Sequence, residues 1–260
     1  MRGSGRIIAQ RRQKLIQLLE REGGSKVLEL RERLGVSEIT IRRDLEELAD
    51  EGLVERYHGG ARLKDRPVME LLYEDKSLLH AATKNAIGAA AAALVSERST
   101  ILLNAGSTAL AVLHHLRDRS LRVVTNNAAA PAEIGGSNVE LILLGGEYRA
   151  KSRSLFGDFA ALTLSQVHAS MCILGVNGVS AKTGLTFSVY TEAAINRLMA
   201  ERCNGEVVVV ADGTKVGTTS NFACVPISRV HVLVTDASAD PQELAAIEAS
   251  GVRVIVVQTA

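Results

Sequence analysis

The 260-residue sequence contains no tryptophan, and aromatic residues of all kinds make up only 3% of it. The hydrophobic content of 47% therefore comes mainly from Ala, Val, Leu and Ile, a composition that suits buried parallel strands covered by helices. Charged residues account for 23% of the chain, which is an ordinary value for a globular protein and gives no reason to expect disorder.

Cysteine is also scarce. Cys172, Cys203 and Cys224 are far apart and show no C-x-x-C spacing. This pattern excludes a disulfide framework and a cysteine-based zinc site, and it indicates small core residues in a reducing compartment. His114 and His115 are adjacent on a predicted helix and so point to different sides, and no other histidine has ligand spacing. We expect no metal and no cofactor.

Long apolar runs are absent as well. The longest, from Ile87 to Val95, is about half of a membrane span and consists mostly of alanine. The residues after Met1 are polar and include no apolar stretch typical of a signal peptide. We therefore expect a cytoplasmic protein without a membrane partner, which associates with the nucleoid only if it binds DNA.

Basic residues are unevenly placed along the chain. The formal net charge is +1, yet residues 1–66 hold 15 Lys and Arg against 12 Asp and Glu, whereas the remainder holds 15 against 17. A surplus this small is weak evidence for nucleic-acid binding on its own, because charged runs usually form solvated helix faces. A motif is needed to decide the point.

Residues 6–63 have the pattern of a winged helix-turn-helix domain. Gly35 and Ser37 mark a tight turn between two helices, because Gly35 tolerates a positive φ and Ser37 can cap the helix that follows. Two short alternating runs, separated by His58-Gly59-Gly60, predict a hairpin. The predicted elements are helices over 7–21, 27–34 and 38–50 and strands over 53–57 and 61–63.

Residues 84–257 predict a larger α/β domain, joined to the first by a linker over residues 64–83. Apolar strands alternate there with helices, which is typical of an open, mostly parallel, Rossmann-like sheet covered on both faces. The predicted strands are Thr100–Leu103, Leu121–Thr125, Val139–Leu144, Met171–Leu174, Val207–Ala211, Val230–Thr235 and Val252–Val257. The predicted helices between them are Thr108–Arg117, Ala128–Ile134, Thr191–Arg202 and Gln242–Ala249.

The third predicted helix carries candidate DNA contacts. With its apolar positions facing inward, Thr40 and Arg43 lie on the outer face and Arg42 lies near its border. A recognition helix meets base edges with its N-terminal turns, and arginine binds guanine through two hydrogen bonds. An isolated Arg pair beside acidic residues is more often a solvated surface, but the helix-turn-helix and hairpin context favours a DNA-reading helix. The candidate contacts to bases or phosphates are Ser37, Glu38, Thr40, Arg42 and Arg43 on the helix and Arg56, His58 and Arg62 on the hairpin.

A second candidate site lies at Asn104-Ala105-Gly106-Ser107-Thr108, which follows a predicted strand and opens a predicted helix. Such a junction directs backbone N–H groups and the positive end of the helix toward an anion. Gly106 lets the backbone come close to a ligand, and the Ser107 and Thr108 hydroxyls can donate hydrogen bonds. The same hydroxyls are suited to capping the helix. The spacing alone leaves phosphate binding and capping open.

Other polar or glycine-rich loops end strands of the same predicted sheet. In an open α/β sheet the carboxyl ends of the strands form the ligand crevice. Lys215 is suited to neutralising a phosphate and Asp212 to binding sugar hydroxyls, although Asp-Gly and Asn-Asn are also common turn formers. The candidate effector-binding residues are Ala105, Gly106, Ser107, Thr108, Asn126, Asn127, Gly145, Gly146, Asp212 and Lys215.

The N-terminal motif resembles the signature of the DeoR family of bacterial transcription regulators. The signature V-S-x-x-T-I-R-R-D-L…G-x-x-x-R-x-H-G-G-A matches at every fixed position from Val36 to Ala61. The resemblance continues through almost all of the C-terminal region, where the motifs are shorter. It implies a homo-oligomeric repressor, a dimer or tetramer, that binds double-stranded operator DNA of carbohydrate-catabolism genes and is released by a small phosphorylated sugar.

The C-terminal loops are similar to those of DeoR-type sensors, whose fold is similar to ribose-5-phosphate isomerase. Two residues depart from the family pattern. Asn104 replaces the usual Asp, which removes a charge, and Asn196 stands where many members have Lys. Both departures bear on which ligand is accepted. The family's D-x-G-S-T, T-N, L-G-G and D-x-x-K loops are matched by Asn104–Thr108, Thr125-Asn126, Leu144–Gly146 and Asp212–Lys215.

The main alternative is a sugar-phosphate isomerase with a DNA-binding appendage. Aldose–ketose isomerisation requires a carboxylate base, and the related isomerases carry acids in an Asp-Gly-Ala-Asp-Glu loop. The matching segment here, Gly175-Val176-Asn177-Gly178-Val179, has no carboxylate. Asp212 and Lys215 serve binding as easily as catalysis. We therefore expect no enzymatic activity and assign no catalytic residue.

Overall fold

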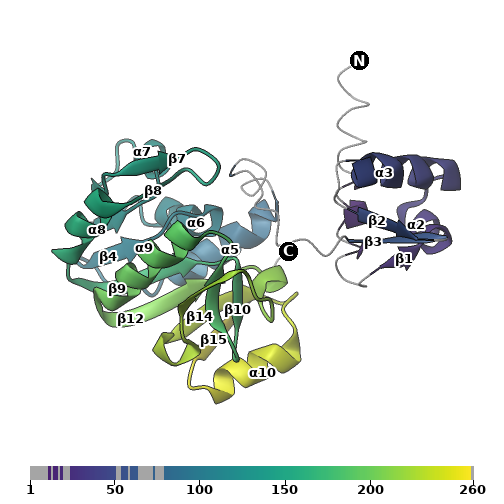
Figure 1. Cartoon of the computed structure of the whole chain (residues 1–260). Coiled ribbons are helices and arrows are strands. Elements are labelled where there is room, and N and C mark those ends of the chain that lie inside the picture. Colours follow the sequence, from purple (N-terminus) through teal and green to yellow (C-terminus); the bar gives the residue numbers. More distant parts are fainter. Residues whose placement is uncertain are drawn as a thin grey trace. The chain divides into compact units, whose positions relative to one another are not determined.

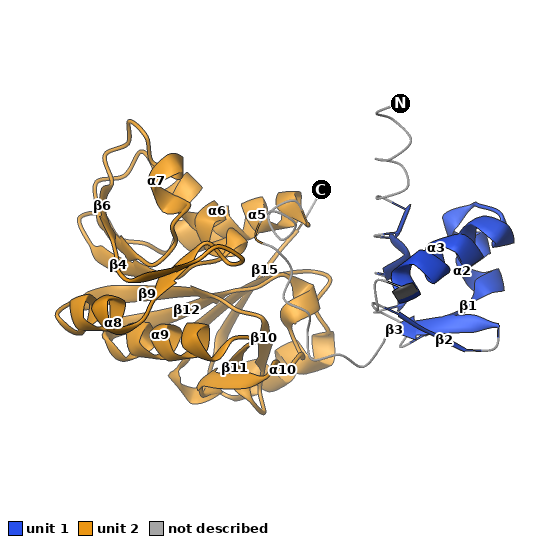
Figure 2. Cartoon of the chain, turned by 45° about the horizontal axis from the view of Figure 1, so that its top comes forward, with its two compact units in different colours: residues 1–66 blue, residues 67–260 orange. Residues whose placement is uncertain are grey.

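The computed structural model describes residues 11–12, 14–16, 18–19, 24–50, 54–57, 59–63, 73 and 79–258. The chain divides into two compact units, residues 1–66 and residues 67–260, which are blue and orange in Figure 2. Among the described residues, buried apolar side chains form one core in the first unit and two in the second. Each unit therefore buries its own hydrophobic surface.

The two predicted helices of the helix-turn-helix are confirmed in unit 1. Helix α2 (Val27–Leu34) ends at Gly35, whose φ of +65° lies in the left-handed region that glycine adopts without strain. Helix α3 (Glu38–Asp50) begins after Ser37, whose Oγ accepts the backbone N–H of Thr40 at 3.2 Å. The turn residues thus have the conformations that the sequence predicts.

The predicted hairpin is present as strands β2 (Val54–Tyr57) and β3 (Gly60–Leu63), which pair antiparallel. A two-residue strand, β1 (Ser25–Lys26), adds to the other side of β3. A Cβ at Gly60 would lie 2.6 Å from the Ser25 carbonyl oxygen and 2.6 Å from the Tyr57 ring. The three strands therefore meet only because a glycine stands at this point.

The predicted first helix, residues 7–21, lies partly outside the described residues. The residues of it that the structure describes are helical, and Leu15 and Leu19 among them are buried. From this segment Arg11 donates two hydrogen bonds to the buried carboxylate of Asp44 on α3, with Nε–Oδ2 at 2.5 Å and Nη2–Oδ1 at 3.0 Å. The hydrogen bond to Asp44 raises the pKa of Arg11. Asp44 therefore joins two helices and does not face DNA.

The main sheet of unit 2 contains seven parallel strands in the order β15-β14-β12-β9-β4-β5-β6, as Figure 1 shows in part. The chain enters the sheet at β4 in its interior and extends it first through β5 and β6 and then, from β9, toward the opposite edge. This is the open parallel arrangement, covered on both faces, that the sequence predicts. Each predicted strand is present, β4 with the predicted bounds and the other six with one or both ends shifted. The strands are β4 (Thr100–Leu103), β5 (Arg122–Thr125), β6 (Glu140–Leu143), β9 (Ala169–Gly175), β12 (Cys203–Val210), β14 (Val232–Asp236) and β15 (Arg253–Val257).

Helices cover both faces of this sheet. Ile101 and Leu103 point into one core, which α5, α6 and α7 share, whereas Leu102 points into the other, which α8, α9 and α10 share. None of the helices in the described part of the chain is long and apolar enough to cross a membrane. The helices are α5 (Ala81–Ala92), α6 (Ser107–His115), α7 (Ala130–Glu133), α8 (Asp158–Ser165), α9 (Tyr190–Glu201) and α10 (Pro241–Ala249).

Unit 2 also contains elements that the sequence does not predict. The strict alternation of strand and helix is wrong after β12, because strand β13 and the two short 3-10 turns η1 and η2 fill the stretch before β14. The five strands of unit 2 that the sequence does not predict are short and lack a clear apolar alternation, so the strands with which they pair determine their structure. The unpredicted strands are β7 (Glu147–Arg149) and β8 (Ser154–Phe156), which form a hairpin, and β10 (Gly178–Ser180), β11 (Gly184–Phe187) and β13 (Phe222–Val225), which form a small antiparallel sheet.

The pairing of Asp44 with Arg11 can be tested by the substitution Asp44→Ala. It removes both acceptors of a half-buried guanidinium, and we expect the free energy of unfolding of unit 1 to fall by about 2 kcal/mol. Hydrogen exchange of the backbone amides of unit 1 in the full chain measures this loss. Glu32→Ala is the matched control, because Glu32 is exposed on α2 and lies 4.0 Å from Arg31. Equal protection in both variants would contradict the proposed structural role.

Candidate functional site

The outer face of α3 presents two arginines. Arg43 has a side chain that is 80% exposed and lies 3.3 Å from Glu47, and the half-exposed Arg42 lies 2.6 Å from Glu38. Both are contacts between residues four positions apart on one helix, and such surface pairs contribute only a few tenths of a kcal/mol. Each guanidinium can therefore exchange its carboxylate for another acceptor at small cost.

Ser37 and Thr40 are partly engaged in starting the helix. The Ser37 Oγ accepts the Thr40 backbone N–H, and the two hydroxyl oxygens lie 2.8 Å apart. Ser37 is exposed, whereas Thr40 is half-buried. These two predicted DNA contacts thus have a capping role in the free protein, which leaves Ser37 the more accessible of the two.

Arginines of the wing lie beside α3. Arg56 on β2 contacts Glu46 on α3 at 2.8 Å, and Arg62 on β3 contacts Glu55 on β2 at 2.8 Å. The first pair is an exposed ion pair between the β2–β3 hairpin and α3, so it is as easily exchanged as those of Arg42 and Arg43. His58, also predicted to contact DNA, lies outside the described residues.

In unit 2 the ends of β4 and β9 are joined by a side chain. Asn104, which is fully buried, donates its Nδ2 hydrogen to the carbonyl oxygen of Gly175 at 2.8 Å and accepts the Gly175 N–H on Oδ1 at 2.8 Å. We expected Asn104 to bear on ligand choice through its missing charge. Its amide is instead paired with backbone on both sides, and an ionised Asp cannot donate the first of these bonds.

The asparagines after β5 shape the loop after β4. The backbone N–H of Ala105 donates to Asn126 Oδ1 at 2.8 Å, and Asn127 Nδ2 donates to the carbonyl oxygen of Gly106 at 3.4 Å. Both asparagine side chains are buried. The structure therefore brings Ala105, Gly106, Asn126 and Asn127 together. The asparagine side chains position the loop through their hydrogen bonds to its backbone.

The loop leads into the N-terminus of α6. A Cβ placed at Gly106 would meet no atom within 4 Å, so the space above the loop is open. Ser107 is half-buried and Thr108 is buried in the first turn. The first N–H groups of a helix have no acceptor within it, and the helix dipole makes this end positive. A helix end of this kind, with open space beside it, suits an anion.

The loop after β12 is the 3-10 turn η1 (Gly213–Lys215). Asp212 begins it and accepts the N–H of Thr214 at 3.2 Å as well as the Thr214 hydroxyl. The N–H of Gly213 donates to Asp236 at 2.7 Å. Burial opposes ionisation of Asp236, but hydrogen bonds from Ser238 and Gly213 outweigh it and lower its pKa.

Lys215 ends this turn with a half-buried side chain. In the sheet β9 lies between β12 and β4, so two strand spacings, about 10 Å, separate the ends of β12 and β4. Asp212 and Lys215 therefore lie at the same edge as Ser107 and Thr108, at a distance that a small metabolite can span.

The glycine pair after β6 has a packing role. Gly146 has a φ of +122°, and a Cβ there would lie 2.2 Å from the carbonyl oxygen of Phe156. Gly145 and Gly146 thus let the chain turn from β6 into the β7–β8 hairpin. Both glycines are exposed, and they follow β6, which is the edge strand next to β5.

The β7–β8 hairpin carries three basic residues that sequence reasoning missed, Arg149, Lys151 and Arg153. Ser154 forms a bridge with Asn127, and the N–H of Ala128 donates to the Arg153 carbonyl oxygen at 2.9 Å. The basic run R-A-K-S-R was the available signal, but it follows no predicted strand. Arg153 has a φ of +48°, a conformation that is unfavourable for a residue other than glycine.

A residue of the predicted linker contacts this hairpin. The backbone N–H of Tyr73 donates to the Lys151 carbonyl oxygen at 2.9 Å, and the Arg153 guanidinium lies 5.2 Å from the centre of the Tyr73 ring. Tyr73 is buried. Tyr73 is thus attached to the basic hairpin through a backbone hydrogen bond and a cation–π contact.

The second departure from the family pattern, Asn196, lies on α9 one turn after Glu192. Its side chain is buried, and within the described part of the chain its Oδ1 has no hydrogen-bond partner. Glu192 lies 3.8 Å from Arg149 of the basic hairpin. A buried amide oxygen is normally satisfied by protein, water or ligand, so the Asn196 oxygen is available for a partner that the described residues do not supply.

The segment that corresponds to the acidic loop of the isomerases has a structural task. Asn177 Oδ1 accepts the Ser188 N–H at 3.0 Å and the Ser188 hydroxyl at 3.1 Å. A Cβ at Gly178 would lie 2.5 Å from the Thr218 carbonyl oxygen. These residues hold the β10–β11 hairpin close to the end of β9, and the segment supplies no acid or base.

The cysteines are core residues. All three are buried free thiols, and burial raises the pKa of Cys172 well above its ordinary value and that of Cys224 to about 12. They are therefore thiols and poor nucleophiles at neutral pH. Across the ranges that the structure describes, no three His, Cys, Asp or Glu side chains lie close enough together to hold a metal ion.

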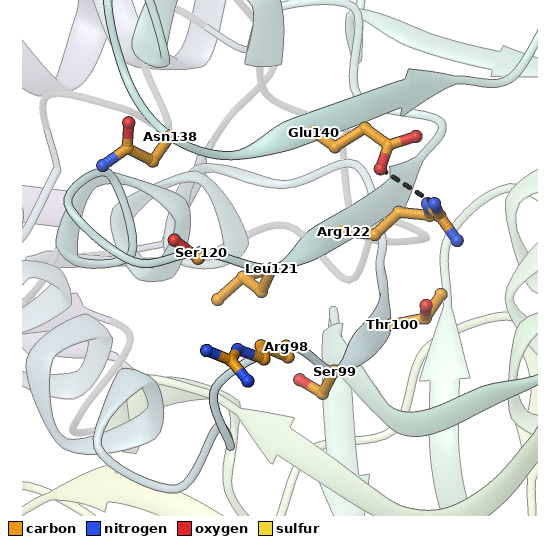
Figure 3. Close-up of a pocket in the computed structure, with 8 residues that line it drawn as sticks. All are labelled: Arg98, Ser99, Thr100, Ser120, Leu121, Arg122, Asn138 and Glu140. Carbon is orange, nitrogen blue, oxygen red and sulfur yellow. Dashed lines mark hydrogen bonds and ion pairs between the residues drawn. The ribbon is translucent and has the colours of Figure 1, made fainter.

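A hollow of about 290 Å³ lies at the opposite edge of the sheet (Figure 3). Thr100, Arg122 and Glu140, the first residues of β4, β5 and β6, contribute to its lining, and Arg122 pairs with Glu140 at 2.8 Å. It shares no residue with the predicted effector site. The loops at the carboxyl ends of the strands remain the candidate site.

The hydrogen bonds by which Asn104 links β4 to β9 can be tested with Asn104→Asp. At neutral pH the carboxylate cannot donate to Gly175 and places a charge against its carbonyl oxygen, so we expect the free energy of unfolding of unit 2 to fall by about 2 kcal/mol. Urea unfolding followed by far-ultraviolet circular dichroism measures this change. Asn204→Asp, the same exchange at an exposed position of β12, should have little effect. An unchanged unfolding midpoint in Asn104→Asp would show that these hydrogen bonds are dispensable.

Comparison with known proteins identifies the family of both units. Residues 11–66 match the DeoR-like helix-turn-helix domain, and residues 79–237 match the DeoR C terminal sensor domain. A putative aga operon transcriptional repressor of Escherichia coli O157:H7 is 31% identical over 253 residues, which cover 96% of this chain and 94% of the relative. The glycerol-3-phosphate regulon repressor of Escherichia coli K12 is 33% identical over 230 residues, 88% of this chain and 90% of the relative.

Among solved structures, ribose 5-phosphate isomerase A of Methanocaldococcus jannaschii is 17% identical, with a TM-score of 0.38 over 51% of this chain and 52% of the isomerase. A likeness at this level carries no argument about activity. The curated relatives are named as transcriptional repressors, and the protein is accordingly a DNA-binding regulator and not an enzyme. The chain belongs to the DeoR family of transcriptional regulators.

Proposed function

We propose that this protein represses a carbohydrate-catabolism operon and leaves its operator when a small phosphorylated sugar binds to unit 2. The helix α3 and the β2–β3 wing contact the operator. The effector lies at the carboxyl edge of the main sheet, across the ends of β12, β9, β4 and β5. The observation that carries the effector site is the open space above Gly106, at a helix N-terminus whose loop is held by Asn126 and Asn127.

The proposed DNA contacts depend on arginines that are accessible and weakly held. Arg43 is the most exposed of them, and its contact with Glu47 is a surface ion pair. A guanine edge offers two acceptors in the geometry of the guanidinium fork, and a phosphate offers a full negative charge. The same surface includes the other proposed DNA contacts, which are Arg42, Arg56 and Arg62 and, at the start of the helix, Ser37, Glu38 and Thr40.

The proposed effector contacts divide into anion-binding and sugar-binding groups. The phosphate accepts hydrogen bonds from the first N–H groups of α6 and from Ser107 and Thr108, and its charge is neutralised by Lys215 and the basic hairpin. Asp212 is placed to meet hydroxyl groups. A relative that is 33% identical is named a glycerol-3-phosphate regulon repressor, which supports a small phosphorylated metabolite as the class of effector.

We further propose that the protein acts as a homo-oligomer, a dimer or tetramer, in the cytoplasm and on the nucleoid. Two copies of α3 can then read successive major grooves, which face one side of the DNA at intervals of about 34 Å. An effector that binds one domain arrangement more tightly than the other shifts the population away from the DNA-bound form. A tenfold weakening of operator binding requires a difference of about 1.4 kcal/mol between the two affinities.

The DNA half of the proposal predicts a loss of operator binding in Arg43→Ala. Removing a guanidinium that pairs with a base should weaken binding roughly 10- to 100-fold, in a mobility-shift assay with duplexes enriched from a random pool by the wild-type protein. Arg253→Ala, which removes the same charge from an exposed position on β15, is the matched control. Equal affinity of both variants for the selected duplexes would refute the assignment of α3 as the reading helix.

The sensor half predicts repressors that bind DNA but are not released. A thermal-shift panel of sugar phosphates first identifies a compound that stabilises the wild-type protein. In Lys215→Ala and Thr108→Val the concentration of this compound that releases half of the operator should rise at least about tenfold, while operator affinity stays unchanged. Lys182→Ala, an exposed lysine of unit 2, is the control. Release at the wild-type concentration in both variants would exclude the proposed site.

A further inference from the structure

Among the described residues of unit 1, the most exposed large apolar side chain lies on α3, the proposed recognition helix. Ile39 stands in the first turn of α3 and is 80% exposed. Successive helical residues are about 100° apart around the axis, and this places Ile39 opposite the buried stripe formed by Ile41, Leu45 and Leu48. Arg43 lies one turn further along the same outer face. Ile39 therefore occupies the centre of the surface that reads DNA.

Among the described residues of unit 1, no contact explains an isoleucine at this position. Ile39 is not part of the core that these residues form, which involves the opposite face of α3. Its β-branched side chain favours the helix less than an unbranched or polar residue would. Single exposed apolar residues are common on protein surfaces. This one, however, lies in the N-terminal turn of a recognition helix, which is the part that approaches base edges.

We propose that Ile39 contacts the C5-methyl group of a thymine in the major groove and so selects a T·A pair at one operator position. That methyl is the apolar group that a standard base pair presents in the major groove, and aliphatic side chains contact it. Arg42 and Arg43 follow within one turn and hold the helix against neighbouring bases or phosphates. The inference rests on the proposed contact of α3 with DNA and names a base that this contact specifies.

A protein partner is less consistent with the surroundings of Ile39. Arg42, Arg43 and Glu46 are all exposed on the same face, and the cores of protein interfaces are depleted of charged residues. A single apolar side chain among charges also offers little area to a partner. A polyanionic groove with isolated methyl groups matches this mixture of one aliphatic side chain and two arginines.

The test removes one methyl group at a time from the DNA. In an operator duplex enriched from a random pool, each thymine is replaced in turn by deoxyuridine, and the dissociation constant is measured for wild-type protein and for Ile39→Ala. With wild-type protein one replacement should weaken binding about three- to fivefold, the effect of losing one buried methyl group. With Ile39→Ala the same replacement should have no effect, because the contact is already lost. Alanine favours the helix, so this variant folds.

Leu28→Ala is the matched control, since Leu28 on α2 is also an exposed aliphatic residue of unit 1, at 54% exposure. It should retain the wild-type response to deoxyuridine at every position. The inference is wrong if every deoxyuridine replacement changes the dissociation constant by the same factor for wild-type protein and for Ile39→Ala. An unchanged operator affinity in Ile39→Ala would overturn it as well. Failure of the broader proposal is distinguishable, because specific binding would then survive Arg43→Ala.

Discussion

The candidate effector site depends on buried side-chain amides that join the ends of neighbouring parallel strands. Asn104 connects β4 to β9 through Gly175, and Asn126 connects the end of β5 to Ala105 in the loop after β4. Where strands give way to loops, backbone groups lose their ladder partners and need others. The amides supply them and hold the loop in place below α6. The space beside Gly106, at the N-terminal end of that helix, is open.

Unit 1 relies on ion pairs of two kinds, which differ in burial. Asp44 and Arg11 are drawn together inside the unit, where loss of one partner leaves an unpaired group. The arginines of the reading surface are paired with exposed glutamates, and water keeps those contacts weak. This division explains how a unit with a small positive surplus can bind DNA. In the proposed DNA complex, phosphates and bases displace the surface carboxylates while the interior pair keeps the helices in position.

The candidate effector site is connected to Tyr73 through the basic hairpin. The basic hairpin touches Asn127 on one side and Tyr73 on the other. Asn127 in turn positions Gly106 at the entrance to α6. The asparagines of the candidate anion site, the basic hairpin and Tyr73 therefore belong to one continuous set of contacts within unit 2.

Residue order is enough to predict the elements whose signals are local. Periodicity and turn residues locate α3, the hairpin and the seven core strands, and the R-R-D-L motif points to Arg42 and Arg43. The role of Asn104 could not be obtained this way, because its partner Gly175 is 71 residues distant. The partner of Asp44 is 33 residues away, and the β7–β8 hairpin is placed by pairing with Asn127. Local propensities act over a few residues, whereas buried polar groups take whichever partner the packed chain brings within hydrogen-bonding distance.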